Sequence, residues 1–283
     1  MHHSYSLSRR LFTPAIHAPG NADGVPGFWY VFRGYRLLVA ERGDRVQLPL
    51  VASPAELELQ PERVQFLGWL DDVPCYAAEV AVDANPPLGW RFEGLRSLLD
   101  ALDTDLFWLA GRAVQIVDWD RTHQFCGRCG TQTVYHARDR ARVCPACGLV
   151  HYPRLSPAII VAVLRDDKIL LARSHRHPPG RYSVLAGFVE PGETLEECVA
   201  REVKEEVDLD VENVRYFGSQ PWPFPHSLMI AFTCEAPRGE IELDTSEMAE
   251  AGWFRADELP PVPPPPTISR RLIDWFAGTH RSG

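Results

Sequence analysis

The chain has 283 residues, of which 45% are hydrophobic and 24% are charged, and its formal net charge is −9. These proportions are typical of a water-soluble globular protein, and the length allows two or three units with separate cores. The negative charge argues against indiscriminate attraction to nucleic acids or membranes, because such attraction needs a basic surface. The sequence has neither an apolar run long enough to span a membrane nor a signal-peptide pattern, so we expect a cytoplasmic protein and no membrane partner.

The first part of the chain, residues 1–120, is interpreted as a small α/β domain. Apolar runs between turn signals predict strands at residues 28–32, 35–39 and 46–51. Leucines recurring on one side predict helices at residues 93–102 and 105–113. The sequence shows no internal repeat and no chemical motif here, so we expect a domain that covers the substrate or forms a dimer.

Four of the seven cysteines form two C-x2-C pairs, separated by fourteen residues. Two such pairs bring four thiolates to one tetrahedral centre, which is the arrangement that structural zinc requires. We therefore predict a zinc ribbon at residues 121–154, with one Zn²⁺ bound by Cys126, Cys129, Cys144 and Cys147. The alternative is two redox or disulfide pairs, which a reducing compartment disfavours.

The third part, residues 155–283, begins with a predicted buried strand at residues 156–164. A hairpin turn then leads into a second strand at residues 169–173. Further strands are predicted at residues 214–217, 228–234 and 253–255. A proline run at residues 260–266 is expected to be a stiff surface segment that precedes a final helix at residues 268–276.

Residues 187–209 combine a glycine-containing loop with an acidic helix. On a helix, Glu202 and Glu206 are one turn apart and Glu205 lies beside them, so their carboxylates repel one another unless a cation lies between them. The apolar stripe of the helix borders these carboxylates, which suits Mg²⁺ or Mn²⁺ bound by oxygen ligands at a half-buried edge. The alternative is a solvated acidic face, which Glu193 and Arg201 at their spacings disfavour.

Residues 219–227 read S-Q-P-W-P-F-P-H-S and contain three prolines in five positions. Because proline does not continue a strand, we expect a rigid loop. Such a loop presents Trp222 and Phe224 to a flat ring with little entropy left to lose on binding. The alternative is a rigid turn whose two aromatic side chains pack into the core.

The spacing G-x5-E-x7-R-E-U-x-E-E-x-G-U, with U an aliphatic residue, is that of the Nudix hydrolases, and residues 187–209 resemble it closely. One position departs, because Asp208 replaces the second glycine, which usually ends the helix with a positive φ. The proline-aromatic run and the four-cysteine ribbon resemble the NADH pyrophosphatase subfamily. This resemblance extends over residues 96–275 or so. It implies an α+β fold, with a Nudix α/β/α sandwich and mixed sheet preceded by the zinc ribbon and the smaller N-terminal domain.

The resemblance also implies the roles of individual residues. Mg²⁺ or Mn²⁺ would be bound by Glu202, Glu206, Glu247 and the main-chain carbonyl of Ala186. Glu205 or Glu247 would orient the attacking water or accept its proton, and the sequence does not choose between them. Arg201 is expected to pair with Glu193 and to fix the loop, as a lone arginine among carboxylates usually does.

Substrate contacts carried over from the subfamily lie in several parts of the chain. They are Arg96, Asp139, Tyr152, Phe188, Ser269 and the loop Gln220, Pro221, Trp222, Pro223, Phe224, Pro225, His226 and Ser227. Phe188 and Tyr152 are candidates for stacking on a nicotinamide ring, although Tyr152 fits the core of the ribbon equally well.

The implied reaction is metal-dependent hydrolysis of NAD(H) to AMP and nicotinamide mononucleotide, with removal of an NAD cap from RNA as the same cleavage, in a homodimer. Arg138, Arg140 and Arg142 form either a basic strip that follows a phosphate chain or a solvated hairpin. Two alternatives remain for the whole protein. One is a Nudix hydrolase of another nucleoside diphosphate such as ADP-ribose, and the other is a non-catalytic zinc-ribbon binding module.

Overall fold

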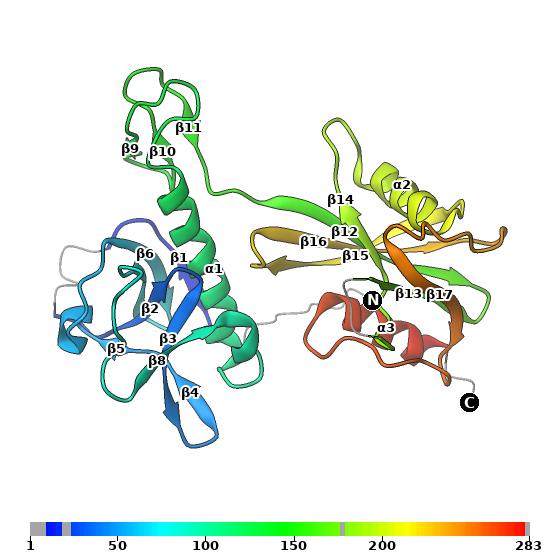
Figure 1. The fold of residues 1–283 in the computed structure, drawn as a ribbon, viewed down its shortest axis with the longest axis horizontal. Coiled ribbons are helices and arrows are strands. Elements are labelled where there is room, and N and C mark those ends of the chain that lie inside the picture. Colours follow the sequence, from blue (N-terminus) through cyan, green and yellow to red (C-terminus); the bar gives the residue numbers. More distant parts are fainter. Residues whose placement is uncertain (1–9, 19–23, 176–178, 281–283) are drawn as a thin grey trace. The chain divides into compact units, whose positions relative to one another are not determined.

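The computed structural model describes residues 10–18, 24–175 and 179–280. It divides the chain into two compact units, Met1–Arg154 and Leu155–Gly283, which are distinguished by colour in Figure 1. Each unit has its own sheet and core. Among the described residues, no helix is both long and apolar enough to cross a membrane.

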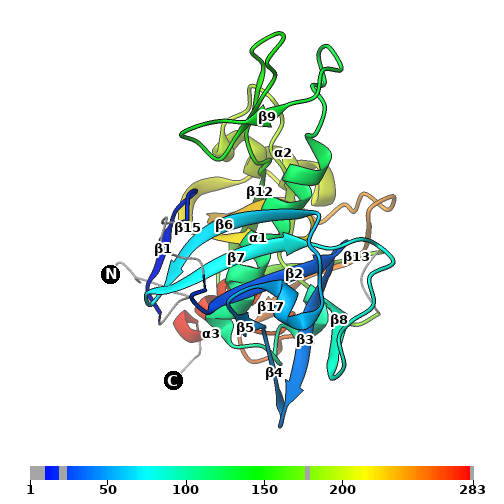
Figure 2. The same cartoon turned by 90° about the vertical axis from the view of Figure 1, so that its left-hand side faces the viewer.

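The N-terminal unit is built on a sheet of eight strands with the order β1-β6-β7-β2-β3-β4, to which β5 and β8 add by pairing with β2 and β3. The helix α1 (Thr104–Thr122) packs against β2, β6 and β7, and Figure 2 shows it lying across one face of the sheet. The strands and short 3-10 helices are β1 (Phe12–Pro14), β2 (Gly27–Arg33), β3 (Arg36–Arg42), β4 (Arg45–Gln47), β5 (Leu50–Val51), η1 (Pro54–Leu57), β6 (Arg63–Leu70), β7 (Val73–Glu79), β8 (Trp90–Gly94) and η2 (Leu95–Leu98).

Part of the sequence-based reading of this unit is wrong. The helix predicted at residues 93–102 is instead the end of β8 followed by η2, because residues 90–94 pair with β3 and extend the sheet. The helix predicted at residues 105–113 exists, but it continues to Thr122. The β6–β7 hairpin was not predicted, since its strands mix polar and small residues with apolar ones. Pairing across the sheet stabilises these strands more than their own residue pattern does.

The C-terminal unit is a mixed sheet between two helices, which confirms the predicted α/β/α sandwich. Its strands have the order β15-β16-β12-β13-β17, with β14 paired to β12, and β12 runs parallel to β16. The elements are β12 (Ser156–Arg165), β13 (Lys168–Ser174), β14 (Leu185–Phe188), α2 (Leu195–Val207), β15 (Glu212–Trp222), β16 (Ser227–Glu235), β17 (Met248–Arg255) and α3 (Ile268–Thr279).

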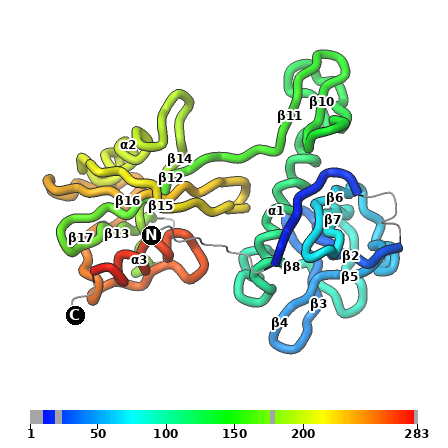
Figure 3. The backbone as a smooth tube through the Cα atoms, turned by 180° about the vertical axis from the view of Figure 1, so that it is seen from behind, coloured from blue at the N-terminus to red at the C-terminus, as the bar shows by residue number. Residues whose placement is uncertain are grey.

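Alternating side chains of β12 form the two cores of this sandwich. Ile159 packs with the α2 residues Val199 and Val203 on one face, whereas Ile160 packs with Phe276 of α3 on the other. Because successive strand residues point to opposite faces, a continuous apolar strand such as β12 must be covered on both sides. Figures 1 and 3 show α2 and α3 on opposite sides of the sheet.

The two units repeat one strand topology, although no repeat is evident in the sequence. In the N-terminal unit the path β6-β7-β2-β3-β8 matches β15-β16-β12-β13-β17, and β5 pairs with β2 as β14 pairs with β12. The central pair is parallel in both units. The element between β5 and β6 is the short η1 where the C-terminal unit has α2. The repeat lies in the connections of the strands, which sequence periodicity does not reveal.

The proline-aromatic segment is also partly a strand. β15 continues through Pro221 to Trp222, and Pro221 lies opposite Leu228 of β16. The expectation that the prolines exclude a strand is therefore wrong here. The physical reason is that β15 is the last strand of its sheet path, and an edge strand tolerates a residue without a backbone N–H.

Candidate active site and zinc centre

The acidic helix α2 begins and ends with well-defined caps. The Thr194 side chain accepts a hydrogen bond from the Glu197 N–H, and the Glu197 carboxylate accepts one from the Thr194 N–H. At the other end, Asp208 adopts the left-handed conformation with φ 53°, and its N–H donates to the Lys204 carbonyl. An ion pair of 2.8 Å between Lys204 and the Asp208 carboxylate adds to this cap. The replacement of the usual glycine by Asp208 therefore leaves the helix end in place.

Arg201 fixes the glycine loop to α2, as the sequence predicts. Its guanidinium donates to both oxygens of the Glu193 carboxylate, at 2.7 and 2.9 Å. A further bond of 2.9 Å reaches the main-chain carbonyl of Phe188 in β14. The same group contacts Glu202 at 2.9 Å and Glu205 at 3.0 Å. Arg201 is thus occupied by protein groups, and its hydrogen bonds lower the pKa of Glu193 to about 2.

Glu202 lies directly against the backbone of β14. A Cβ atom placed on Gly187 would be 1.7 Å from the carboxyl carbon of Glu202 and about as close to both of its oxygens. Only a residue without a side chain leaves this space, so the first glycine of the motif has a steric role here. Burial raises the pKa of Glu202, and Arg201 partly opposes that effect.

Glu206 is a buried acid without a local counter-charge. Its side chain lies in the core with the residue only 5% exposed, and its Oε2 atom has no hydrogen-bond partner among the described residues. Burial and, in that order, the charges of Glu202, Glu247 and Glu205 together raise the pKa of Glu206 to about 8. An unpartnered buried carboxylate surrounded by like charges fits a bound divalent cation, which would neutralise all of them.

The remaining proposed metal and catalytic groups come from β14, from α2 itself and from the residue before β17. Glu247 immediately precedes β17, and its main-chain carbonyl accepts a hydrogen bond of 3.2 Å from His175 N–H. Ala186 lies in β14 beside Gly187. Glu205 is on the solvent side of α2 and is held by Arg201.

The structure gives some predicted substrate residues roles within the fold. Gln220 is fully buried, and its amide binds the Pro266 carbonyl at 2.9 Å and the Ile268 N–H at 2.8 Å. It thereby ties β15 to the start of α3. Ser269 is buried nearby and its hydroxyl bonds to Thr267 at 3.1 Å. Substrate contact by these two residues remains a prediction.

The aromatic residues predicted to bind substrate in the C-terminal unit are partly or largely exposed. Phe188 is 58% exposed at the end of β14. Trp222 and Phe224 are half-buried and pack edge to face, with ring centroids 5.0 Å apart. The His226 ring is hydrogen-bonded to the Ser156 hydroxyl at 3.1 Å, and Ser227 is buried. The rest of the predicted loop consists of Pro221, Pro223 and Pro225.

Three predicted substrate residues belong to the N-terminal unit. Arg96 lies in η2 and is exposed. Asp139 is also exposed and forms an ion pair of 3.3 Å with His136 when the histidine is protonated. Tyr152 is 59% exposed, so it is not a core residue of the ribbon. These three residues and Phe188 belong to different compact units. Binding of one substrate by residues of both units is therefore a proposal.

The four cysteines converge as the zinc prediction requires. Their sulfur atoms lie within 4.8 Å of one another, with Cys126 to Cys147 at 3.6 Å and Cys129 to Cys144 at 3.5 Å. Tetrahedral Zn–S bonds of about 2.3 Å require sulfur separations of about 3.8 Å, so the donor set fits zinc. The two cysteine turns are also equivalent, since Gly130 and Gly148 both have positive φ and donate to the first cysteine carbonyl of their turn.

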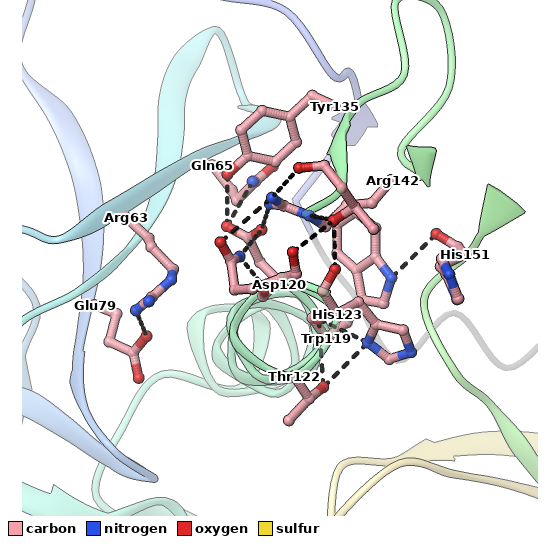
Figure 4. A network of polar contacts seen from close by, with 12 residues as sticks. Arg63, Gln65, Glu79, Trp119, Asp120, Thr122, His123, Tyr135, Arg142 and His151 are labelled. Atoms are coloured by element: carbon pink, nitrogen blue, oxygen red, sulfur yellow. Dashed lines mark hydrogen bonds and ion pairs between the residues drawn. The ribbon is translucent and has the colours of Figure 1, made fainter. Parts of the chain in front are cut away.

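A buried polar network joins this ribbon to α1 (Figure 4). The ribbon sheet has the order β11-β10-β9, formed by β9 (Val134–Tyr135), β10 (Arg142–Val143) and β11 (Val150–His151). Arg142 forms a buried ion pair with Asp120, which is fully buried near the end of α1. Asp120 also accepts hydrogen bonds from Tyr135 at 2.7 Å and Gln65 at 3.1 Å. Sequence analysis missed Asp120, although an aspartate among apolar helix residues is a signal of a buried partner.

The basic strip predicted at the ribbon does not form. Arg142 is buried and paired with Asp120, and Arg140 is half-buried against the N-terminal sheet. Only Arg138 is fully at the surface. The alternative of a solvated hairpin is wrong for the same two arginines, because both contact other segments of the unit.

Comparison with known families matches three successive parts of the chain. Residues 26–119 match an "NADH pyrophosphatase-like rudimentary NUDIX domain", residues 121–152 match an "NADH pyrophosphatase zinc ribbon domain", and residues 154–276 match a "NUDIX domain". The first match agrees with the repeated topology and with the absence of a metal helix between β5 and β6 in the described N-terminal unit.

Curated relatives match over most of their length. The NAD-capped RNA hydrolase NudC of Deinococcus radiodurans is 44% identical over 95% of this chain and 93% of its own. The protein of the same name from Pectobacterium atrosepticum is 52% identical over 88% of this chain and 91% of its own. The protein of the same name from Stutzerimonas stutzeri is 48% identical over 82% of this chain and 80% of its own. The shared domains and this extent of identity show that the chain belongs to the NADH pyrophosphatase (NudC) family of Nudix hydrolases.

Proposed function

We propose that the protein hydrolyses the pyrophosphate bond of NAD(H) to AMP and nicotinamide mononucleotide, and that it removes an NAD cap from RNA by the same cleavage. The observation that carries this proposal is the buried Glu206 carboxylate, which has an unpartnered oxygen and acidic neighbours. A divalent cation satisfies that arrangement and is what pyrophosphate hydrolysis needs. The names of the similar proteins, NAD-capped RNA hydrolases, support the choice of substrate.

The catalytic cation would be Mg²⁺ or Mn²⁺, held by Glu202, Glu206, Glu247 and the Ala186 carbonyl. When bound, such an ion neutralises phosphate charge and lowers the pKa of a coordinated water. Arg201 holds Glu202 against β14 and keeps the Phe188 carbonyl in place, so it positions the metal site without contacting phosphate. Glu205 or Glu247 accepts the proton of the attacking water, and kcat against pH for the two Gln variants decides between them.

The substrate rings would be held by aromatic side chains at the surface of each unit. Phe188 and Tyr152 are exposed and available for stacking on nicotinamide, whereas Trp222 and Phe224 form a stiff pair at the end of β15. Arg96 and Asp139 would contact polar groups of the substrate. The buried Gln220 stabilises the loop by its hydrogen bonds to Pro266 and Ile268 at the start of α3.

The proposal is tested with purified protein, NADH, ADP-ribose and NAD-capped RNA, each with and without Mn²⁺. We expect AMP and reduced nicotinamide mononucleotide from NADH, no turnover after chelation, and slower turnover of ADP-ribose. Glu206→Gln should lower kcat by about 10²-fold or more. Glu196→Gln is the matched control, since Glu196 is exposed at the start of the same helix. Wild-type turnover by Glu206→Gln would contradict the metal assignment, and a preference for ADP-ribose would contradict the substrate.

The resemblance to the subfamily further supports a homodimer that works in the cytoplasm. Light scattering of the purified protein tests the homodimer, and we expect about twice the chain mass of 31.9 kDa. A mass of one chain at micromolar concentration would contradict it. Fractionation of cells that express the tagged chain tests the second.

A further inference from the structure

The buried Arg142 side chain contacts both segments of the ribbon that carry zinc ligands. Arg142 itself lies two residues before Cys144, on the second of these segments. Its guanidinium donates to the Thr133 hydroxyl at 2.8 Å and to the Thr133 carbonyl at 3.1 Å. It also donates to the Gln124 side chain at 3.3 Å. Gln124 and Thr133 lie on either side of the first C-x2-C pair, so one side chain joins the two ligand-bearing segments.

The backbone of the ribbon closes each cysteine turn separately. The Gly130 N–H donates to the Cys126 carbonyl at 2.8 Å, and the Gly148 N–H donates to the Cys144 carbonyl at 2.9 Å. The three strands that connect the turns, β9, β10 and β11, are each two residues long. Strands this short stabilise a sheet weakly in water. The two cysteine turns therefore need side-chain contacts, such as those of Arg142, to stay together.

Asp120 fixes the position of the Arg142 guanidinium. This carboxylate is fully buried near the end of α1 and forms an ion pair with Arg142 (Figure 4). It is itself held by hydrogen bonds from Tyr135 at 2.7 Å and from Gln65 at 3.1 Å. Because a guanidinium is planar and its donors point in fixed directions, anchoring one edge of it also directs its other hydrogen bonds. Arg142 is thus held on α1 while it contacts the ribbon.

We propose that Arg142, held by Asp120, is a positioning residue of the zinc centre that slows the loss of the metal. Four thiolates must be brought together to bind zinc, and a site that is already ordered loses less entropy on binding. Arg142 supplies part of that order without being a ligand. All of these contacts lie within the N-terminal unit. Zinc content and release are measured without substrate, so neither depends on the proposed reaction.

Glu79 forms a comparable buried ion pair elsewhere in the same unit. Its residue is 4% exposed, and its carboxylate accepts hydrogen bonds of 2.7 Å from Arg63 of β6 and from Arg121 of α1. Neither arginine belongs to the ribbon. Glu79→Gln therefore shows how far a general loosening of the N-terminal unit affects the zinc site.

The test measures zinc release from the full-length, zinc-loaded protein into an excess of a chromogenic chelator. The main variant is Asp120→Asn with Arg142→Gln, because this pair of changes leaves no buried charge unpaired. Changing a residue that supports a metal ligand typically alters metal affinity by about 10- to 100-fold. We expect release about 10-fold faster, since Arg142 supports the ligand-bearing segments and not the sulfur atoms. The control Glu79→Gln should release zinc at the wild-type rate.

Arg142→Lys separates the charge of the side chain from its geometry. Lysine keeps a positive charge beside Asp120, but its single nitrogen does not reproduce a planar fork that also reaches Thr133 and Gln124. We expect this variant to release zinc faster than the wild type and slower than the double variant. It also serves as the test if the double variant does not fold. Titration of the metal-free proteins with Co²⁺, followed by the thiolate-to-metal absorption band, should give the same order of affinities.

Four results would overturn the proposal. The first is release at the wild-type rate by the double variant. The second is equal acceleration by Glu79→Gln, which would assign the effect to general loosening of the unit. Release at the wild-type rate by Arg142→Lys would show that charge suffices and that the hydrogen bonds to the two segments have no role. Absence of zinc from the purified wild-type protein would remove the site on which Arg142 acts, and would leave the test of NADH hydrolysis unchanged.

Discussion

Gly187→Ala tests whether the glycine loop serves to place a single carboxylate. The new Cβ would lie 1.7 Å from the carboxyl carbon of Glu202, whereas ordinary contact begins at 3.4 Å. The Glu202 carboxylate must therefore move by the difference, 1.7 Å. Metal–oxygen distances in such sites tolerate only about 0.2 Å. We expect coordination by Glu202 to be lost and kcat to fall by about 10²- to 10³-fold, as for the loss of one electrostatic catalytic group.

The fold should survive this substitution. The atoms that the new Cβ meets are the end of a flexible side chain, and Gly187 does not have a positive φ. Removal of a glycine from the unfolded chain stabilises by about 0.4–1 kcal/mol, which offsets part of the local repulsion. Urea unfolding should therefore show a change of about 1 kcal/mol or less. Gly278→Ala in α3 is the control, since its Cβ meets no atom within 4 Å and activity should not change.

A double-mutant cycle sharpens the test. In a Glu202→Ala background the obstructing carboxylate is absent, so adding Gly187→Ala should cost no further activity. NADH hydrolysis by the four proteins, with saturating Mn²⁺, measures the coupling. Wild-type kcat in Gly187→Ala, or fully additive losses in the cycle, would refute the view that Gly187 acts through Glu202.

Three further predictions follow from the two centres and the exposed ring. Because burial and the neighbouring carboxylates raise the pKa of Glu206 to about 8, Mn²⁺ must displace a proton below that pH, so its Kd in calorimetry should rise about tenfold per pH unit from pH 8 to pH 6. The same proton makes the metal-free protein less stable as the pH rises from 4.5 to 8. A Kd for Mn²⁺ that stays constant between pH 6 and pH 8 would contradict the assignment. Elemental analysis should find about one zinc per chain. Its removal should increase hydrogen exchange around Asp120 while α2 stays protected, and equal exchange in both would contradict the ribbon–α1 link. Phe188→Ala should weaken NADH hydrolysis about 5- to 150-fold and ADP-ribose hydrolysis much less, since stacking on one ring contributes about 1–3 kcal/mol. Equal losses on the two substrates in a stable variant would show that Phe188 does not contact nicotinamide.

The sequence by itself determined the chemistry of this protein, because that chemistry depends on residues at short, fixed spacings. The distance from Gly187 to Glu206 along one loop and one helix predicts the metal helix, and the two C-x2-C pairs predict the zinc centre. The pairing of Arg201 with Glu193 was predictable for the same reason, since both ends of the contact lie within this motif. Helix α2 even ends at its expected residue, although Asp208 replaces glycine there.

Tertiary structure alone decided the features that depend on residues far apart in the chain. The Glu202 carboxylate needs a glycine at position 187 because α2 packs against β14. The buried Asp120 carboxylate is stabilised because the ribbon places Arg142 beside it. Pro221 is accepted in β15 because this strand lies at a sheet edge, and the helix expected at residues 93–102 is replaced because β3 pairs with β8. The repeated sheet topology has no sequence period, since strand order is set by long-range pairing and burial. Local residue patterns determine which groups can react, whereas burial and packing determine their environment.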